Sequence, residues 1–269
     1  MNYLKDYREG EKFVGTYLCK QKQILKTKAG KTYYSLTLQD KTGTADGKIW
    51  ELNNGIANFE PMDYIHCEGM VTSFQGNLQM NISRVRISDE GEYDPADYVP
   101  CTNKDVGEMF SRILKYVASV QNKYLRKILE MYFVENKEFV DAFKKHSAAK
   151  SVHHGFMGGL LEHTLSVTDM CQYFAEHYPM IHRDLLITAA LFHDMGKIQE
   201  ISDFPMNDYT DDGQLLGHIY IGARCMENAA AQIPNFPPKL KNELVHCILA
   251  HHGKMEFGSP KVPAIMEAM

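Results

Sequence analysis

The pattern of hydrophobic and polar positions divides the chain into two parts with different periods. From residue 11 to about residue 87, apolar and polar residues alternate in short segments rich in Tyr, Thr, Val and Ile, with Gly and Asn in the turns between them. Alternation with a period of two is typical of half-buried strands, and such turns join hairpins. The pattern therefore predicts a small five-stranded β-barrel, with strands at residues 13–21, 32–40, 43–51, 63–74 and 78–87.

The period changes after the predicted barrel. Residues 89–100 are acidic, contain two prolines and follow neither period, which is typical of a linker. Thr102 followed by Asp105 resembles a capping box, and the apolar positions from Val106 to Val117 then fall on one helical face. Further helices are predicted at residues 137–149, 160–177, 183–193, 218–232 and 239–252. We therefore expect a multidomain α and β chain, with a barrel domain at 1–90, a linker at 91–101 and an all-α bundle at 102–269.

Composition narrows this picture only slightly. The chain has 269 residues, 44% of them hydrophobic, and a formal net charge of −5, so any nucleic-acid site must be a local feature of the surface. It lacks an apolar run of about 18 residues that would span a bilayer. The six cysteines are far apart and form no CxxC pair, which argues against a disulfide framework or a zinc–thiolate site. We expect a soluble cytoplasmic protein with reduced thiols.

The sharpest chemical signal is a His-Asp doublet at the end of an apolar helix. His193 and Asp194 follow the apolar run of residues 185–192 and precede Gly196 and Lys197. An apolar helix has no structural need for this ending. Neutral imidazole and carboxylate are ligands of divalent transition ions, and one Asp can bridge two ions through its two oxygens.

Other histidines mark helix starts, interiors and ends in the same part of the chain. Any one of them alone is more often an ordinary hydrogen-bonded histidine than a ligand. Together with the doublet they could converge at the centre of a helical bundle. They are His163, His218, His251 and His252.

These residues carry a resemblance to a known superfamily. His163, the His193-Asp194 doublet and Gly196-Lys197 resemble the HD phosphohydrolase pattern, and the additional histidines resemble its two-ion variants. A barrel placed before this domain, with His153-His154-Gly155 and the segment 158–167, resembles the bacterial YhaM-type 3′→5′ exoribonucleases over nearly the whole chain. One feature departs from the superfamily pattern, which ends with an Asp on a later helix. The sequence has no Asp after His252, so we expect a domain truncated at its C-terminus and one ion short of a ligand.

The resemblance implies a site for two divalent ions, which would activate water for attack on phosphorus. The first ion would be held by His163, His193 and Asp194. The second would be held by Asp194, His218 and either His251 or His252. Mixed imidazole and carboxylate ligands favour Mn, Fe, Co, Ni or Zn over Mg, and the resemblance indicates manganese.

Three further residues are expected to contact the substrate. Lys197 would reach a phosphate oxygen, with a helix-terminal lysine that satisfies the dipole as the alternative interpretation. His154, with His153, would contact a phosphate or act as an acid towards the leaving oxygen. The remaining histidines are expected to be structural or solvent-facing: His66, His146, His177, His182 and His246.

The barrel carries a local basic segment among aromatic residues. The first hairpin contains five lysines without an intervening acid, a pattern that is usually a solvated edge. Here aromatic residues flank it, and cations mixed with stacking rings are used by OB-fold barrels to bind single strands. Because side chains alternate along a strand, Tyr34 is expected in the core and Tyr33 on the surface. The expected nucleic-acid contacts are Lys26, Lys28, Lys31, Tyr33, Trp50 and Phe74.

A stacking barrel joined to a phosphodiesterase site favours a single-stranded polymer as substrate. The resemblance implies that the substrate is RNA, that cleavage proceeds 3′→5′ and that the products are nucleoside 5′-monophosphates. The residues themselves do not distinguish RNA from single-stranded DNA and do not indicate an oligomeric state. One alternative is an HD enzyme for a small nucleotide or cyclic dinucleotide, which predicts that deletion of residues 1–90 leaves turnover of long RNA unchanged. A second is a non-catalytic single-strand binder, which predicts that the chain holds no metal tightly.

Overall fold

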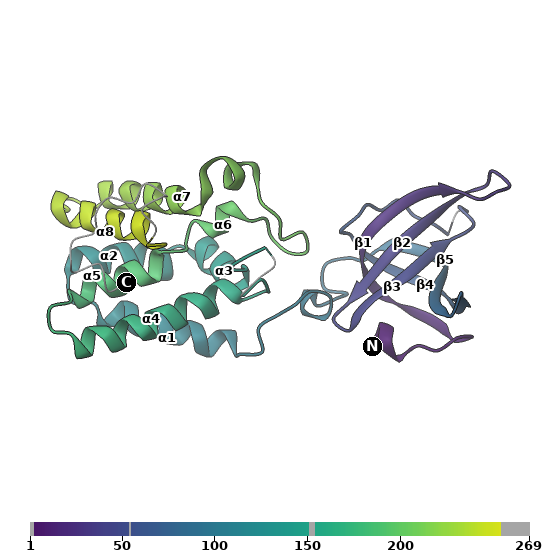
Figure 1. Cartoon of the computed structure of the whole chain (residues 1–269), viewed down its shortest axis with the longest axis horizontal. Coiled ribbons are helices and arrows are strands. Elements are labelled where there is room, and N and C mark those ends of the chain that lie inside the picture. Colours follow the sequence, from purple (N-terminus) through teal and green to yellow (C-terminus); the bar gives the residue numbers. More distant parts are fainter. Residues whose placement is uncertain (1–2, 54, 151–153, 254–269) are drawn as a thin grey trace. The chain divides into compact units, whose positions relative to one another are not determined.

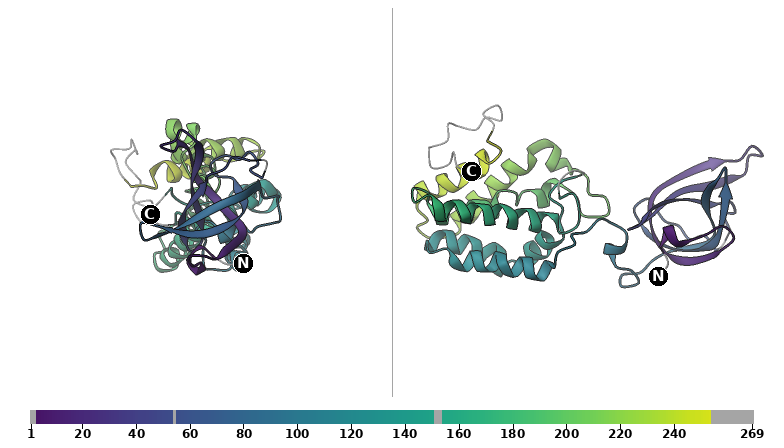
Figure 2. Two further views of the ribbon diagram at one scale, coloured as in Figure 1. Left: turned by 90° about the vertical axis from the view of Figure 1, so that its right-hand side faces the viewer. Right: turned by 60° about the horizontal axis from the view of Figure 1, so that its bottom comes forward.

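The strands predicted in the first part of the chain form a closed barrel (Figure 1). The structure, a computed structural model, describes residues 3–53, 55–150 and 154–253. The strands are β1 (Lys12–Lys26), β2 (Thr32–Asp40), β3 (Gly43–Ile49), β4 (Tyr64–Phe74) and β5 (Asn77–Ile87). Their order is β1-β2-β3-β5-β4, with β4 closing back on β1; the β3–β5 pair is parallel and the other pairs are antiparallel. This five-stranded arrangement confirms the predicted OB-like barrel, and Figure 2 shows its strands curving around a common axis.

Inward-facing residues of alternate positions fill the barrel. Leu36 and Leu38 of β2 are buried, and Tyr34 packs partly buried against the same core, whereas Tyr33 lies on the outer face. Two strand ends differ from the prediction by more than one residue. The first strand continues five residues past Gln21 because residues 22–26 still pair with β2, and β3 ends at Ile49, so Trp50 follows the strand.

Part of the segment expected as a linker packs against the barrel. Tyr93 stacks on Tyr64 with ring centroids 4.0 Å apart, and the buried Tyr98 meets Tyr64 edge-on at 5.3 Å. The Lys41 ammonium lies 2.8 Å from the Asp97 carboxylate, which belongs to the short helix η2 (Pro95–Asp97). Residues Met1–Pro100 accordingly form one compact unit and Cys101–Met269 another.

The second unit is a helical bundle built around a helix that is buried over most of its length. Its helices are α1 (Val106–Ser119), α2 (Lys123–Glu130), α3 (Lys137–Lys145), α4 (Gly159–His177), α5 (Arg183–Phe192), α6 (Lys197–Glu200), α7 (Asp211–Ala231) and α8 (Pro238–Ala250). Every residue of α5 from Leu185 to Phe192 is buried, as expected for a helix that is apolar on all sides. Helix α5 contacts α1, α2, α4 and α8. None of the helices in the described ranges has the length and apolarity to cross a bilayer.

The helical prediction needs three corrections. The N-cap of α1 is Asp105, whose carboxylate accepts from the Glu108 backbone N–H at 2.7 Å; the Thr102 hydroxyl instead donates to Glu162. Helix α2, the π-helical turn that follows it (Met131–Glu135) and the short helix α6 were not predicted. Helix α7 begins at Asp211 and bends at Gly217, so the predicted helix from His218 is only its second part.

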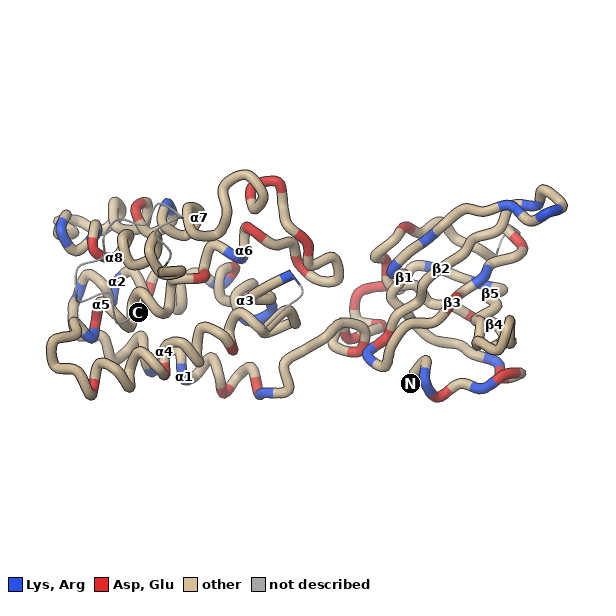
Figure 3. Tube along the Cα trace, viewed as in Figure 1, with Lys and Arg blue, Asp and Glu red and all other residues tan. Residues whose placement is uncertain are grey.

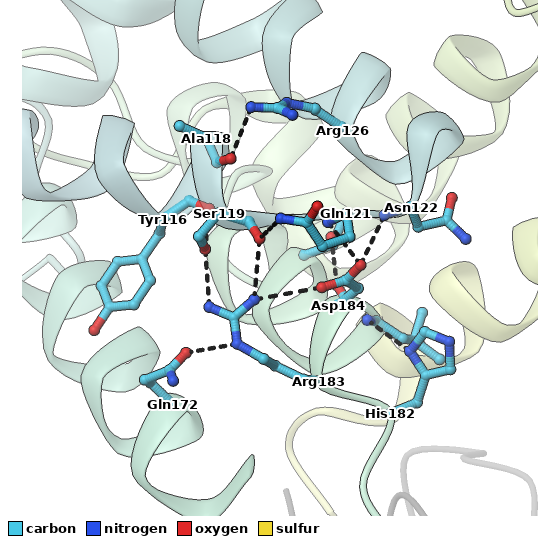
Figure 4. Close-up of polar contacts among 12 residues, drawn as sticks. Tyr116, Ala118, Ser119, Gln121, Asn122, Arg126, Gln172, His182, Arg183 and Asp184 are labelled. Atoms are coloured by element: carbon cyan, nitrogen blue, oxygen red, sulfur yellow. Dashed lines mark hydrogen bonds and ion pairs between the residues drawn. The ribbon is translucent and has the colours of Figure 1, made fainter. Parts of the chain in front are cut away.

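The N-terminal end of α5 is fixed to its neighbours by a polar network (Figure 4). The Asp184 carboxylate accepts hydrogen bonds from the backbone N–H groups of Gln121 and Asn122 at 2.8 and 2.7 Å. The Arg183 guanidinium donates to the Ser119 hydroxyl at 2.8 Å and to Gln172 of α4 at 3.0 Å. These contacts hold the start of the helix whose other end carries the His-Asp doublet.

Candidate metal centre

Asp194 lies buried where the end of α5 meets several other helices. It lies two residues after the last residue of α5, and only 2% of its surface is exposed. Close approach of α6 and α7 requires Gly196, because a Cβ at this position would lie 2.1 Å from the His218 carbonyl oxygen. The backbone therefore brings the doublet and the start of the second part of α7 into contact.

The two oxygens of Asp194 face two different groups of residues. Oδ2 lies 3.2 Å from Nε2 of both His163 and His193. Oδ1 lies 3.5 Å from Nε2 of His218 and 3.6 Å from Nε2 of His251. One carboxylate thus stands between two sets of imidazole nitrogens.

The imidazoles present the same nitrogen to this carboxylate. Nδ1 of His193 donates to the Ala190 carbonyl at 2.7 Å, and Nδ1 of His251 donates to the Ile248 carbonyl at 2.7 Å. With the proton held on Nδ1, the lone pair of Nε2 is directed towards Asp194. This is the tautomer that a histidine needs in order to bind a metal through Nε2.

The donor atoms fit divalent ions. Asp194 Oδ1 and the Nε2 atoms of His218 and His251 are buried without a hydrogen-bond partner among the described residues. Such atoms are costly to bury unless something else binds them. Two clusters have ligand atoms within 4.8 Å of one another: His163, His193 and Asp194, and His218, His251 and His252. Their oxygen and imidazole donors suit transition metals.

The charge states also suit a metal centre. Burial opposes ionisation of Asp194, but attraction and hydrogen bonds from the surrounding imidazoles when they carry a second proton, above all from His193, outweigh it and hold the pKa of Asp194 well below its usual value. Partial burial, together with neighbouring His251 and His218, lowers the pKa of His252 to about 4. At neutral pH the carboxylate is therefore charged and His252 is neutral, as ligation requires.

Lys197 and His154 lie at the same centre. The Lys197 ammonium donates to the Ala148 carbonyl at 2.7 Å and lies 3.0 Å from Asp194 Oδ2. The His154 ring lies 5.3 Å from the His163 ring, between centroids. His153, which was expected to act with His154, lies outside the described residues. Apart from His153, the metal and catalytic residues expected from the sequence thus gather around Asp194 and its neighbouring histidines.

Sequence reasoning missed Glu200, which lies behind His218. Its side chain is largely buried, and Oε1 accepts from Nδ1 of His218 at 2.9 Å and from the His218 backbone N–H at 3.0 Å. A glutamate at the end of a short helix is unremarkable in sequence. Only the packing of α6 against α7 shows that it supports a candidate ligand.

The barrel gathers five of the six expected nucleic-acid contacts at one end. Tyr33 and Trp50 stack with centroids 4.6 Å apart, and the Trp50 indole N–H donates to Asn81 Oδ1 at 3.1 Å. Figure 3 shows basic residues gathered on the adjoining β1–β2 hairpin. These are Lys26, which ends β1, and Lys28 and Lys31 in the connection to β2.

Phe74 is set apart from this cluster. It is 61% exposed and pairs with Asn77 where β4 turns into β5. Asn77 is four residues along β5 from Asn81, a distance of about 13 Å at the usual rise per strand residue. Phe74 instead lines a separate surface hollow with Leu4 and Thr44.

Comparison with known proteins identifies both the domain and relatives of the whole chain. The HD domain family model matches residues 160–265, which confirms the HD-type helical domain. A protein named 3′-5′ exoribonuclease YhaM from Listeria innocua is 32% identical over 274 residues, covering 98% of this chain and 84% of the relative. Proteins of the same name from a Geobacillus species and from Bacillus subtilis are 32% and 31% identical; each alignment covers 89% of this chain, and 73% and 76% of the relatives.

Proposed function

Because the chain belongs to the YhaM family of 3′-5′ exoribonucleases, we propose that it is a metal-dependent hydrolase that degrades single-stranded RNA from its 3′ end. The products would be nucleoside 5′-monophosphates. The six cysteines all lie in the described part of the chain and form no disulfide there, which is in keeping with a cytoplasmic site of action.

The observation that carries this proposal is the position of Asp194 between two histidine groups. Its Oδ2 faces His163 and His193, and its Oδ1 faces His218 and His251. We assign one divalent ion to the first group and a second to the other, with Asp194 shared and His252 completing the second set. Manganese is the ion that we favour. When bound, two such ions activate water and neutralise charge that develops on the phosphate.

The chain's own residues hold and orient the substrate. The Lys197 ammonium, fixed by Ala148 and Asp194, would interact with a non-bridging phosphate oxygen. His154 lies beside His163 and would contact the phosphate or protonate the leaving oxygen. Burial of Asp194 keeps these charges in surroundings of low dielectric, where each interaction is stronger than in water.

The barrel would bind the single strand upstream of the scissile bond. The Tyr33–Trp50 pair offers a ring face for a base, and Lys26, Lys28 and Lys31 offer cations for phosphates. Phe74 would provide a separate stacking position. Stacking and phosphate contacts tolerate DNA as well as RNA, so single-stranded DNA is a further ligand to test.

The test follows cleavage of a 5′-labelled single-stranded RNA with manganese. We expect a shortening ladder that retains the label, with nucleoside 5′-monophosphates identified by mass spectrometry. His163→Ala should abolish it. His177→Ala is the matched control on the same helix: His177 stacks on Tyr173, away from the doublet, and this variant should cleave normally.

Other outcomes separate the competing functions. Intact RNA together with hydrolysis of a cyclic dinucleotide would replace the exonuclease by a small-nucleotide phosphodiesterase. Intact RNA, no bound metal and salt-dependent binding of oligonucleotides would leave a single-strand binder. Release of a labelled mononucleotide at the start of the reaction would show that degradation begins at the 5′ end, opposite to the proposed direction.

A further inference from the structure

The buried carboxylate of Glu200 differs in kind from the acceptors behind His193 and His251. His193 and His251 direct their Nδ1 protons to backbone carbonyls, of Ala190 and Ile248. His218 alone among these three directs Nδ1 to a side chain, at 2.9 Å from Glu200 Oε1. The orientation of the His218 ring therefore depends on the side chain of Glu200 rather than on a backbone carbonyl of the helix that carries His218.

The backbone around Glu200 and His218 is shaped for this contact. Gly217 has φ 71° and ψ 155°, a conformation almost restricted to glycine, and it turns α7 so that the backbone N–H of His218 also reaches Glu200 Oε1 at 3.0 Å. A Cβ at Gly213 would lie 2.1 Å from the Glu200 carbonyl oxygen, so the backbones of α6 and α7 also approach each other closely beside Glu200. One carboxylate oxygen thus receives two hydrogen bonds from a single residue.

We propose that Glu200 is a positioning residue that fixes His218 in its Nδ1-protonated tautomer and thereby sets the affinity of the ion on the His218 side of Asp194. The inference rests on the two-ion arrangement of the proposed function. A carboxylate acceptor orients the ring and makes Nε2 more basic, and loss of such a partner typically weakens metal binding about 10- to 100-fold. The ion held by His163 and His193 has no contact with Glu200 through its ligands, so its affinity should not change.

The proposal is tested by Mn²⁺ binding to the full chain, measured by equilibrium dialysis and elemental analysis. The wild type should bind two ions. Glu200→Ala should weaken one of them about 10- to 100-fold and leave the other unchanged. Glu200→Gln should weaken the same ion by less, because its amide oxygen still accepts a hydrogen bond from Nδ1. Glu227→Gln, at an exposed position on α7, is the matched control and should bind like the wild type.

A measurement on the metal-free protein separates positioning from a merely structural role. Long-range ¹H–¹⁵N NMR of the histidine rings should show His218 protonated on Nδ1 in the wild type and a mixture of tautomers in Glu200→Ala. A wild-type His218 protonated on Nε2 would overturn the proposal even if the variants failed to fold. Equal weakening of both ions, or of neither, would overturn it as well.

The outcome is independent of whether RNA is the substrate. If the wild type leaves RNA intact but Glu200→Ala loses one ion selectively, the positioning role stands and the proposed function fails. If the wild type degrades RNA and Glu200→Ala keeps both ions at wild-type affinity, the function stands and the positioning role fails.

Discussion

Trp50 allows a direct test of binding by the barrel, because it is the only tryptophan of the chain. Its indole stacks on Tyr33 and its N–H is held by Asn81. The side chain is nevertheless 39% exposed, which leaves ring surface for a base. We expect Trp50→Ala to weaken binding of single-stranded RNA without unfolding the barrel.

The magnitude follows from the number of stacking faces removed. Base–aromatic stacking contributes about 1–3 kcal/mol per base, and about 1.4 kcal/mol corresponds to a tenfold change in Kd. Removal of Trp50 should therefore raise Kd about 5- to 140-fold if one base stacks there. Trp50→Phe keeps a smaller aromatic ring, so its affinity for RNA should fall by less. Because Lys26 and Lys28 remain, the salt dependence of binding should not change.

The assay titrates the protein with an oligoribonucleotide in EDTA, so that hydrolysis does not interfere. Tryptophan fluorescence of the wild type should change as the base stacks, and anisotropy of a labelled oligonucleotide gives Kd for each variant. Val14→Ala, at a 62% exposed position of β1, is the control and should bind normally. The reasoning would be refuted if the oligonucleotide bound tightly without changing Trp50 fluorescence and if Trp50→Ala had the same Kd as the wild type.

Three further predictions concern stability and reactivity. Gly217→Ala should lower the free energy of unfolding of the helical unit by about 1–3 kcal/mol, because its φ of 71° with ψ of 155° is strained for alanine; unchanged urea unfolding would contradict this. Asp184→Ala removes the acceptor of two backbone N–H groups and should cost about 1–3 kcal/mol in thermal unfolding, whereas the same Tm as the wild type would argue against an anchoring role. Burial raises the pKa of Cys19 and of Cys247 to about 12, so both thiols should resist iodoacetamide at pH 8 until their units unfold; rapid labelling of the native protein, detected by mass spectrometry, would disprove it.

The barrel was the more predictable of the two folds, because burial of alternate residues leaves a direct trace in sequence. The prediction for β2 has the observed bounds, and those for β4 and β5 differ by one residue at one end. The first strand was predicted too short because Lys22 and Lys26 lie on an exposed part of it. Backbone pairing with Leu36 and Thr32 extends this part, and pairing of that kind does not require apolar side chains.

The helical prediction failed where a helix was short or depended on distant partners. Helix α2 buries Leu125, Ile128 and Leu129 within eight residues, too few turns to establish a helical period before the π-helical turn interrupts it. The candidate ligands were found because a His-Asp doublet at the end of an apolar helix is unusual in itself. Glu200 was missed because its significance lies in the contact with His218, eighteen residues away.

The charges around Asp194 explain how one site can attract both cations and a polyanion. The ionised groups described at the centre are the carboxylates of Asp194 and Glu200 and the ammonium of Lys197, which leaves an excess of one negative charge. The imidazoles add none while they are neutral, and burial strengthens the attraction for a cation. Two divalent ions would reverse the sign of the centre and make it attractive to a phosphate backbone. In the proposed site Lys197 would act in both states, because an ammonium held 3.0 Å from Asp194 Oδ2 offsets part of the carboxylate charge while the ions are absent and would add to the attraction for phosphate when they are present.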